Sequence, residues 1–381
     1  MPLAPCSSPP AIRLTATGCL TALGDASATH ASLLSNHRAL QLQPVLGRDG
    51  GDAVPLALLP QRPLDETAPP NWLGHLDTLA EQIPAADWGS PRLPVFVTSS
   101  NFGVGSLYAF QRTRDPAHLT SGTPFASVEL IRQHFGWGAN VSILSHACVS
   151  AHLGLLLATR SLHAGLADRA LVFTFDFVSP FVAGGFHALK ILNNGFPAPY
   201  AARDTGSIGL GDGAAFAVLE RIDAPLLAPS RETFLIQAQS LYNEMHHFTA
   251  NRADGSGFAA CLEPLVSAGN DRRIWIKGHG TGTLEAGRLE ADTLATHFPT
   301  APLVSWKGSL GHTLGSCGLV ELALAVQSLR HGRAPGTIGS AAPFFRDNVA
   351  AEPFSTAAFD AVLLTSNAFG GAHAACLLTP A

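Results

Sequence analysis

Short runs of β-branched and aromatic residues alternate along this chain with longer stretches of small and apolar residues. The short runs are typical of strands and predict them over 11–17, 94–99, 141–144, 171–177, 214–220, 233–239, 273–277 and 361–366. The longer stretches predict helices over 27–36, 127–135, 149–164, 285–297 and 317–331, the last ended by Gly332. This alternation predicts an α/β fold in which helices cover both faces of the sheets.

Two of the predicted helices lack a polar face. "HLGLLLATRSLHAG" follows Cys148 closely, and "CGLVELALAVQSLRHG" begins at Cys317. A helix that is apolar nearly all round is expected to be buried on every side. Because each half of the chain carries one such helix, the pattern indicates an internal duplication, with one compact unit made of two similar halves.

Composition narrows the class of protein. The 381 residues are 46% hydrophobic and 13% charged, which allows a large core. A net charge of −5 and the lack of a basic run argue against nucleic-acid binding. We see no signal peptide and no apolar run long enough for a membrane span, so a cytoplasmic protein is expected. The six cysteines are scattered without a CxxC pair, which predicts neither a zinc knuckle nor a disulfide framework.

The lone cysteine in "SHACVSA" (145–151) allows two interpretations. An unpaired cysteine usually behaves as a small buried hydrophobe. Cys148 also lies where a predicted strand passes into a helix, and a helix amino end favours a thiolate and offers N–H groups to an oxyanion. A nucleophile needs partners, and the local sequence supplies none.

Candidate partners follow far downstream. "IWIKGHGTGT" places His279 on a turn after an apolar strand, and "SWKGSLGHTLGSCGLVE" contains Lys307, His312 and Glu321. "TSNAFGGAH" places Phe369 at a strand end beside two glycines. Taken singly, each has an ordinary explanation: a turn histidine, a solvated lysine or a core phenylalanine.

Taken together and in this order, the set resembles the β-ketoacyl synthases, the condensing enzymes of fatty-acid and polyketide synthesis. The matching segments are "ACVSA", "YAARDTGSIGLGDGAAFAVLE" (200–220), "HGTGT", "KGSLGHTLGSCGLVE" and "SNAFGGAHAACLL". The resemblance implies a thiolase-like fold with α-β-α-β-α layering. Its amino-terminal half, over 1–225, would carry the cysteine, and its carboxy-terminal half, over 226–381, both histidines.

The resemblance also implies roles at the site. Cys148 would accept the acyl chain, and His279 and His312 would stabilise malonyl decarboxylation and the resulting enolate. Lys307 and Glu321 would be the supporting charges beside the histidines.

A gate over the cysteine is implied as well. Phe369, followed by Gly370 and Gly371, would close over Cys148, and its N–H would join that of the cysteine in an oxyanion hole. Glu244 and His247, in "YNEMHHFT", occupy positions that resemble the family's mobile second loop.

The implied reaction is a decarboxylative Claisen condensation between carrier-protein thioesters, and it needs no metal or organic cofactor. A metal site at His146, Cys148 and His152 is disfavoured because a strand-to-helix break separates the two histidines. The expected partners are acyl carrier protein and a second subunit, identical or related. Arg203 and Arg112 are candidates for a basic patch that would meet the acidic carrier.

Three departures from the family pattern point to a specialised, divergent synthase. Ala286-Gly287 stand where a Gly-Asp pair is common; Glu290 keeps the later acidic position, and Glu285 could substitute for the missing aspartate. Ala372-His373 stand where Thr-Asn is common, which is expected to change the hydrogen bonding of the gate. Stretches that shape the acyl pocket are also shorter than usual.

Three alternatives stay open at the level of sequence. The first is a non-condensing partner subunit of the chain-length-factor type, which usually lacks the cysteine, whereas Cys148 and both histidines are present here. A thiolase that uses coenzyme A is disfavoured by the Lys307 and His312 arrangement. An acyltransferase that stops at the Cys148 thioester is the third.

Overall fold

The main sheet consists of two sets of five strands, described by a computed structural model. The structure describes residues 10–44, 53–64, 72–202, 207–222, 232–269 and 271–381. The first set has the order β6-β5-β7-β9-β1 and the second has the order β12-β11-β15-β16-β10. The first comprises β1 (Ala11–Thr21), β5 (Val95–Thr98), β6 (Val141–Leu144), β7 (Arg169–Asp176) and β9 (Gly213–Ile222). The second comprises β10 (Phe234–Asn243), β11 (Ile274–Lys277), β12 (Leu303–Val304), β15 (Ala361–Ala368) and β16 (Ala372–Pro380).

The two sets have the same topology. In each, the three strands at the outer end are parallel and the remaining neighbours are antiparallel. The sets join through a short antiparallel contact between β1 and β10. This repetition agrees with the duplication expected from the two apolar helices. The proposed boundary near residue 225 lies outside the described residues, so the division into 1–225 and 226–381 stays a prediction.

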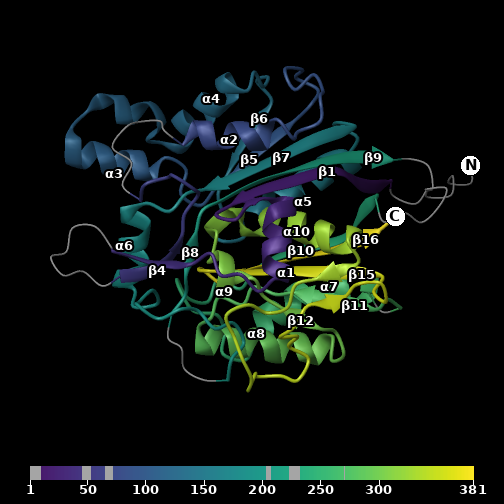
Figure 1. Cartoon of the computed structure of the whole chain (residues 1–381). Helices are drawn as coiled ribbons and strands as arrows, with labels where there is room; N and C mark the ends of the chain where they lie inside the picture. Colours follow the sequence, from purple (N-terminus) through teal and green to yellow (C-terminus); the bar gives the residue numbers. More distant parts are fainter. Residues whose placement is uncertain (1–9, 45–52, 65–71, 203–206, 223–231, 270) are drawn as a thin grey trace, which may run out of the picture.

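Two central helices lie between the sets of strands. They are α5 (Ser150–His163) and α10 (Cys317–Arg330), which pack against each other and against strands of both sets. Figure 1 shows this central layer, with α2 (Leu73–Ala80) and α4 (Pro124–His134) beyond one set of strands and α7 (Ser256–Gly269) and α8 (Leu284–His297) beyond the other. The α/β fold with α-β-α-β-α layering is therefore confirmed.

Shorter elements complete the fold. The helices are α1 (Ala26–Leu34), α3 (Val104–Thr113), α6 (Pro180–Ala188), α9 (Lys307–Leu310) and the 3-10 turns η1 (Pro116–Ser121) and η2 (Leu314–Ser316). The strands are β2 (Gly24–Asp25), β3 (Gln41–Pro44), β4 (Ala53–Ala57), β8 (Leu210–Gly211), β13 (Arg333–Ala334) and β14 (Phe354–Ser355). No helix in the described part of the chain is long and apolar enough to cross a membrane.

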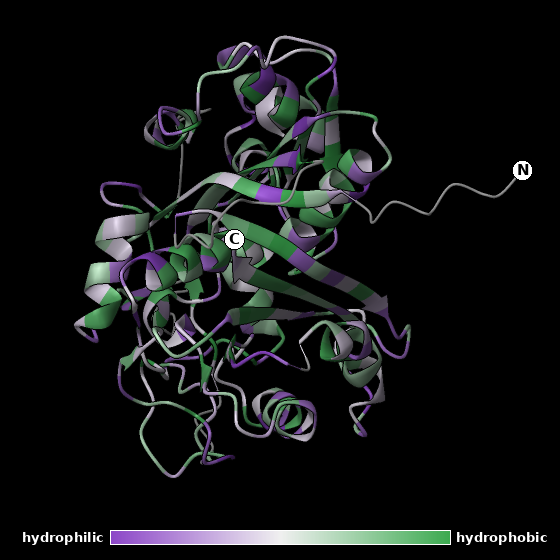
Figure 2. Ribbon diagram, turned by 90° about the vertical axis from the view of Figure 1, so that its right-hand side faces the viewer, coloured by the Kyte–Doolittle hydropathy of each residue, from purple (hydrophilic) through white to green (hydrophobic). Residues whose placement is uncertain are grey.

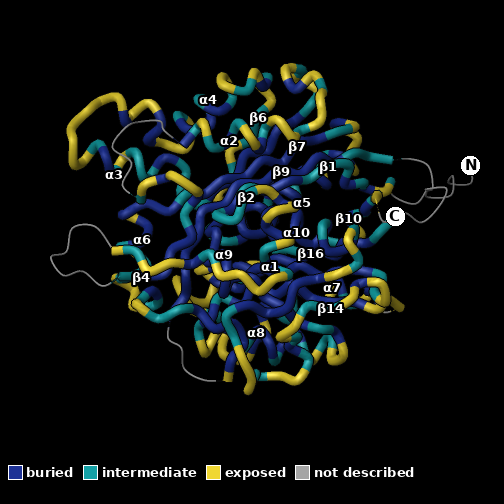
Figure 3. The backbone as a smooth tube through the Cα atoms, viewed as in Figure 1, coloured by how far each residue is buried: buried dark blue, intermediate teal, exposed yellow. Residues whose placement is uncertain are grey.

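Burial follows the layers. Hydrophobic residues predominate on the strands, and hydrophilic residues are more frequent on the surrounding helices and loops (Figure 2). Figure 3 shows the same division as buried and exposed backbone. Helix α10 is buried along nearly its whole length, and Gly332 follows it with a φ of 70°, as expected of a helix end. Helix α5 differs from the prediction, because Leu153, Leu156 and Leu157 are only partly buried.

Candidate active site

Cys148 lies on the turn that joins β6 to α5, at the amino end of the helix. Ala147 before it has a φ of 46°, and the Ser150 hydroxyl braces the turn by accepting from the His146 N–H and donating to the Ala147 carbonyl, each at 2.7 Å. The cysteine is partly exposed. It packs in an apolar cluster that includes Val149, Leu241, Ala368, Ala372 and Ala374.

These surroundings disfavour the ionised thiol. Desolvation raises the pKa of Cys148, the nearby Cys317 and Asp176 raise it further, and the Lys307 ammonium acts in the opposite direction. The sequence predicted that the helix amino end would favour a thiolate. The structure does not support that expectation, because burial raises the pKa of the Cys148 thiol above its ordinary value and so favours the protonated form.

The two histidines meet in the interior. His279 follows β11 and His312 follows α9, and their ring centroids lie 4.9 Å apart with the planes at 86°. The Leu314 N–H donates to Nδ1 of His312 at 3.1 Å, which places the ring proton on Nε2. Within the described residues, Nε2 of His312 and Nδ1 of His279 are buried without a hydrogen-bond partner.

Both histidines are neutral. Burial lowers the pKa of each well below 6.5, and the charges of Lys307 and Lys277 lower it further. A neutral imidazole whose N–H has no partner is a hydrogen-bond donor available to a ligand. His312 therefore offers an uncharged donor at Nε2 to an oxygen on which negative charge develops, and the unpartnered Nδ1 of His279 belongs to the neighbouring ring.

Glu290 on α8 fixes the turn that carries His279. Its carboxylate accepts from the N–H groups of His279 and Gly280 at 2.6 and 2.8 Å, from the Tyr200 hydroxyl at 3.0 Å and from the Thr365 hydroxyl at 3.1 Å. Four donors hold this buried carboxylate in place.

Glu285, suggested as a substitute for the missing aspartate, is exposed on α8, whereas Glu290 is the carboxylate that binds the His279 turn. Substitution by Glu285 stays a prediction. Ala286 and Gly287 line a small hollow beside His279 and Glu290.

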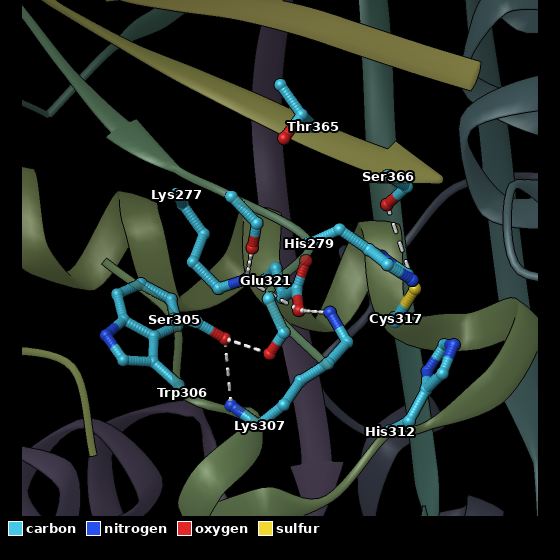
Figure 4. A network of polar contacts seen from close by, with 12 residues as sticks. Lys277, His279, Ser305, Trp306, Lys307, His312, Cys317, Glu321, Thr365 and Ser366 are labelled. Atoms are coloured by element: carbon cyan, nitrogen blue, oxygen red, sulfur yellow. Dashed lines mark hydrogen bonds and ion pairs between the residues drawn. The ribbon is translucent and has the colours of Figure 1, made fainter. Parts of the chain in front are cut away.

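Lys307 and Glu321 form a buried ion pair with a third member. Lys307 Nζ lies 2.5 Å from Glu321 Oε1, and Lys277 Nζ lies 2.7 Å from the same oxygen. Figure 4 shows the Glu321 carboxylate between the two lysine side chains, close to His279. Although burial opposes it, the two lysines hold the pKa of Glu321 below its usual range.

The predicted gate lies between Ala368 and Ala372, two residues of the apolar cluster that packs against Cys148. Phe369 is exposed, and its ring stacks on Phe186 of α6 with centroids 5.9 Å apart. Gly370 and Gly371 have φ values of 85° and 70°, which favour glycine. The Gly370 N–H donates to the Phe248 carbonyl at 2.8 Å, so the gate is joined to the segment after β10.

Of the two residues predicted on that segment, one faces inward. Glu244 is buried, its N–H donates to the Gly371 carbonyl at 2.9 Å, and its Oε1 accepts from the Arg252 N–H at 2.8 Å. His247 is exposed, and its Nδ1 accepts from the N–H groups of two residues of its own loop, at 3.2 and 3.3 Å. The structure therefore does not bring His247 to the site.

Lys277 and Cys317 are absent from the sequence-based site. The Cys317 thiol donates to the Cys148 carbonyl at 3.3 Å, and it lies 3.8 Å from the Ser366 hydroxyl. The signal for Lys277 was present: a charged residue ends the otherwise apolar run "IWIK" directly before Gly278-His279.

The remaining candidates lie apart from this cluster. His146 Nε2 lies 2.9 Å from the Asn243 amide oxygen, whereas His152 is buried beneath α10. Across the described chain, no group of three or more His, Cys, Asp and Glu side chains is arranged to hold a metal ion. Arg112 is exposed on α3, and Arg203 lies outside the described residues.

Comparison with known families matches both halves of the chain. The family model described as "Beta-ketoacyl synthase, N-terminal domain" matches residues 90–224, which include Cys148. The model described as "Beta-ketoacyl synthase, C-terminal domain" matches residues 235–341, which include both histidines, Lys307 and Glu321. Phe369 lies beyond the matched ranges.

Curated relatives and solved structures agree with these matches. The granaticin putative β-ketoacyl synthase 1 of Streptomyces violaceoruber is 27% identical over 69% of this chain and 68% of its own length. The tetracenomycin ketoacyl synthase alpha subunit of Streptomyces glaucescens is 28% identical over 62% of this chain and 59% of its own. A β-ketoacyl synthase from Burkholderia phymatum superposes with a TM-score of 0.80 at 18% identity over 98% of this chain and 100% of its own. A Xenorhabdus doucetiae ketosynthase, solved with its chain length factor, has a TM-score of 0.77 at 20% identity over the whole of both chains. The solved structures show the thiolase-like fold of the ketosynthases.

Proposed function

Since this chain belongs to the β-ketoacyl synthase family, we propose that it is a condensing enzyme that joins a malonyl unit to an acyl chain held on Cys148. Both groups would arrive on acyl carrier protein, in specialised polyketide, polyene or fatty-acid synthesis. The observation that carries the proposal is the pair of buried, neutral histidines with unpartnered ring nitrogens, set beside the Lys277–Glu321–Lys307 cluster. That arrangement suits an enolate better than it suits a structural role.

In the first half-reaction, Cys148 takes the acyl group. The acyl carbon bonds to Sγ, the carbon–sulfur bond to the carrier breaks, and the thiol proton passes to the departing carrier sulfur. A resting thiol supplies that proton. The N–H groups of Cys148 and Phe369 are the proposed donors to the transient oxyanion, with Phe369 positioned by its stacking on Phe186.

In the second half-reaction, the malonyl group becomes the nucleophile. Its carbon–carbon bond to the carboxylate breaks, CO2 leaves, and the electron pair passes into the thioester enolate. His312 donates its Nε2–H to the enolate oxygen, and His279 lies beside it as the second uncharged donor. The enolate carbon then bonds to the acyl carbon, and the Cys148 sulfur leaves and regains a proton.

The edge of the sheet supports a dimer. Strand β6 ends the first set and pairs with β5 alone within the described chain, so its outer edge is open to a partner strand. Ile143 on that strand and Phe125 on the neighbouring α4 are exposed apolar residues. We propose that this edge meets a second subunit, identical or related. Replacing Ile143 with lysine should halve the mass measured by size-exclusion light scattering, and an unchanged mass would rule this edge out.

A non-condensing subunit of the chain-length-factor type is the rival proposal, because that kind of subunit shares the fold. The rival does not require Cys148, the neutral histidines or the buried lysine cluster. All of these are present and assembled here, which favours catalysis.

Intact-protein mass spectrometry tests the proposal directly. The wild type and Cys148→Ala are mixed with a panel of acyl-carrier proteins, and malonyl-carrier is then added. An acyl mass on the wild type alone, cleared by malonyl-carrier to give a β-ketoacyl product, is the expected result. A wild type that never acquires an acyl mass, alone or with candidate partner subunits, supports the rival instead.

A further inference from the structure

The chain contains only three lysines, Lys190, Lys277 and Lys307. Lys190 is exposed after α6, whereas the other two are buried, at 0% and 2% exposure, on a single carboxylate oxygen of Glu321. A buried lysine is costly unless its charge is compensated, so two on one carboxylate is an unusual placement. The charge of Lys277 therefore needs partners in addition to the carboxylate that it shares with Lys307.

Lys277 has a complete set of contacts for a cation. Besides Glu321, its Nζ donates to the Gly278 carbonyl at 2.5 Å and lies 5.5 Å from the centroid of the Trp306 ring. A carboxylate, a carbonyl and an aromatic face are all favourable partners for an ammonium group. The position is therefore built for a charged side chain.

The charge on Glu321 is shared. If Lys307 were its sole partner, the carboxylate would cancel that lysine's charge; with Lys277 on the same oxygen, one positive charge is left over in the three-residue cluster. The other carboxylate that acts on Lys307 is Glu290, and four donors already engage it. The remaining titratable neighbours carry no charge near neutral pH: burial lowers the pKa of His152 to about 4, lowers that of His279 well below 6.5, and raises that of Cys317 to about 11.

The net positive charge of the three-residue cluster acts on both histidines. Lys277 and Lys307 each help to lower the pKa of His279 and His312, because a nearby cation disfavours an imidazolium. The same field favours an anion at the same place. The lysine whose charge bears on the Cys148 thiol is Lys307, so the two half-reactions differ in how far they depend on Lys277.

We infer that Lys277 is a positioning residue for the second half-reaction: by sharing Glu321 with Lys307, it leaves a positive charge behind the histidines that stabilises the enolate formed as CO2 leaves. This inference rests on the proposed function. Lys277, the last residue of β11, would supply a net positive charge that the Lys307–Glu321 pair alone does not supply.

The first test compares Lys277→Met with the wild type in each half-reaction separately. Acyl transfer to Cys148 is followed by intact mass, and decarboxylation of malonyl-carrier protein is followed by release of CO2. We expect decarboxylation to fall roughly ten-fold or more and acyl transfer to change less than about three-fold. Lys190→Met, at the exposed lysine, is the matched control and should leave both rates unchanged.

The second test uses pH. Burial lowers the pKa of Lys277 to about 8, with Lys307 acting in the same direction and Glu321 opposing it. The protonated form is the useful one, so decarboxylation by the wild type should decline as pH rises through about 8. Lys277→Arg keeps the charge at every pH used and should retain most of the rate while losing this decline. Lys277→Met should lose both the rate and the decline.

A readout independent of activity guards against variants that do not fold. In protein labelled with ¹³C at the lysine ε-carbon, three signals are expected, and Lys190→Met identifies the exposed one. Of the two others, one should titrate near pH 8. If neither buried lysine titrates below its ordinary range, or if Lys277→Met matches the active wild type in rate and pH profile, the inference is overturned and the proposed function stands. A wild type that neither loads nor decarboxylates overturns both.

Discussion

The imidazole of His373 and the carboxylate of Glu244 face each other in the interior, with Nε2 of the histidine 3.6 Å from Oε2 of the glutamate. Both side chains are almost fully buried, and His373 Nδ1 lies 2.7 Å from the Asn367 amide oxygen. His373 is on β16, just after the Phe369 gate, and Glu244 follows β10. The Ala372-His373 departure noted in the sequence therefore joins the gate to the neighbouring loop.

Removing this imidazole should loosen the gate. His373→Ala opens a cavity beside Phe258 and the Glu244 carboxylate, so we expect a loss of about 2–4 kcal/mol in the free energy of unfolding. Exchange of the Gly370 N–H, which donates to the Phe248 carbonyl, should become faster. Urea denaturation and hydrogen exchange measure the two effects. His247→Ala, exposed on the same loop, is the control, and equal losses in both variants would contradict the prediction.

The layered fold could be predicted because its central elements have strong local patterns. Helix α10 is apolar nearly all round, and strands such as β7 are short buried runs rich in β-branched and aromatic residues. Other elements lack such a signal. Strand β16, "AHAACLLTP", has no β-branched residue before its threonine, and α7 contains Pro264, so both were missed. Their assignment depends on the neighbours against which they pack, which one sequence does not show.

The residues of the site also divide into those that the sequence predicted and those that it missed. The order of Cys148, His279, Lys307 and His312 along the chain predicted them as site residues, and the structure brings the last three together. Their catalytic role stays a prediction. Lys277 was not identified, because its burial depends on a carboxylate supplied by a distant helix, α10. His247 was expected at the gate, but hydrogen bonds within its own loop hold it outward.

The histidines determine how decarboxylation responds to acid. Because the pKa of both His279 and His312 lies well below 6.5, they stay neutral as pH falls from about 7.5 to 6.5, and the rate should not fall over that range. His312→Ala should lower decarboxylation by roughly 10²–10³-fold, because it removes the donor to the enolate oxygen, while acyl transfer to Cys148 persists. Rates of CO2 release against pH test this, with the exposed His246→Ala as control. A loss of rate between pH 7.5 and 6.5 would contradict the prediction, because it would mean that a histidine needed in its neutral form becomes protonated in that range.

Glu321 stabilises the fold as well as the site. Glu321→Gln leaves two buried ammonium groups without a counter-charge, and we expect it to lower the free energy of unfolding by about 3–5 kcal/mol at pH 7. The unfolded lysines then bind more protons than the folded ones, so stability should rise with pH and the deficit should shrink at about pH 9. Urea denaturation at both pH values measures the deficit. The exposed Glu285→Gln should show none, and a deficit in Glu321→Gln that is independent of pH would argue against uncompensated lysines.

The two central helices approach each other closely where Gly318 of α10 faces His152 of α5. A Cβ placed on Gly318 of α10 would lie 2.6 Å from Cδ2 and 2.9 Å from Nε2 of the His152 ring on α5. Gly318→Ala should therefore cost about 1–3 kcal/mol of unfolding free energy. Once His152→Ala has removed the ring, the same substitution should be neutral or stabilising by up to about 1 kcal/mol, because alanine is the better helix former.

The coupling between these two substitutions, measured by urea denaturation of a double-mutant cycle, is expected to exceed about 1 kcal/mol. Gly74→Ala is the matched control, since this helical glycine on α2 has open space around its Cβ direction and should show no cost in either background. If Gly318→Ala costs the same with and without the His152 ring, the obstacle lies elsewhere in the helix contact. If the cost disappears, the close approach of α5 and α10 beneath Cys148 depends on glycine at that one position.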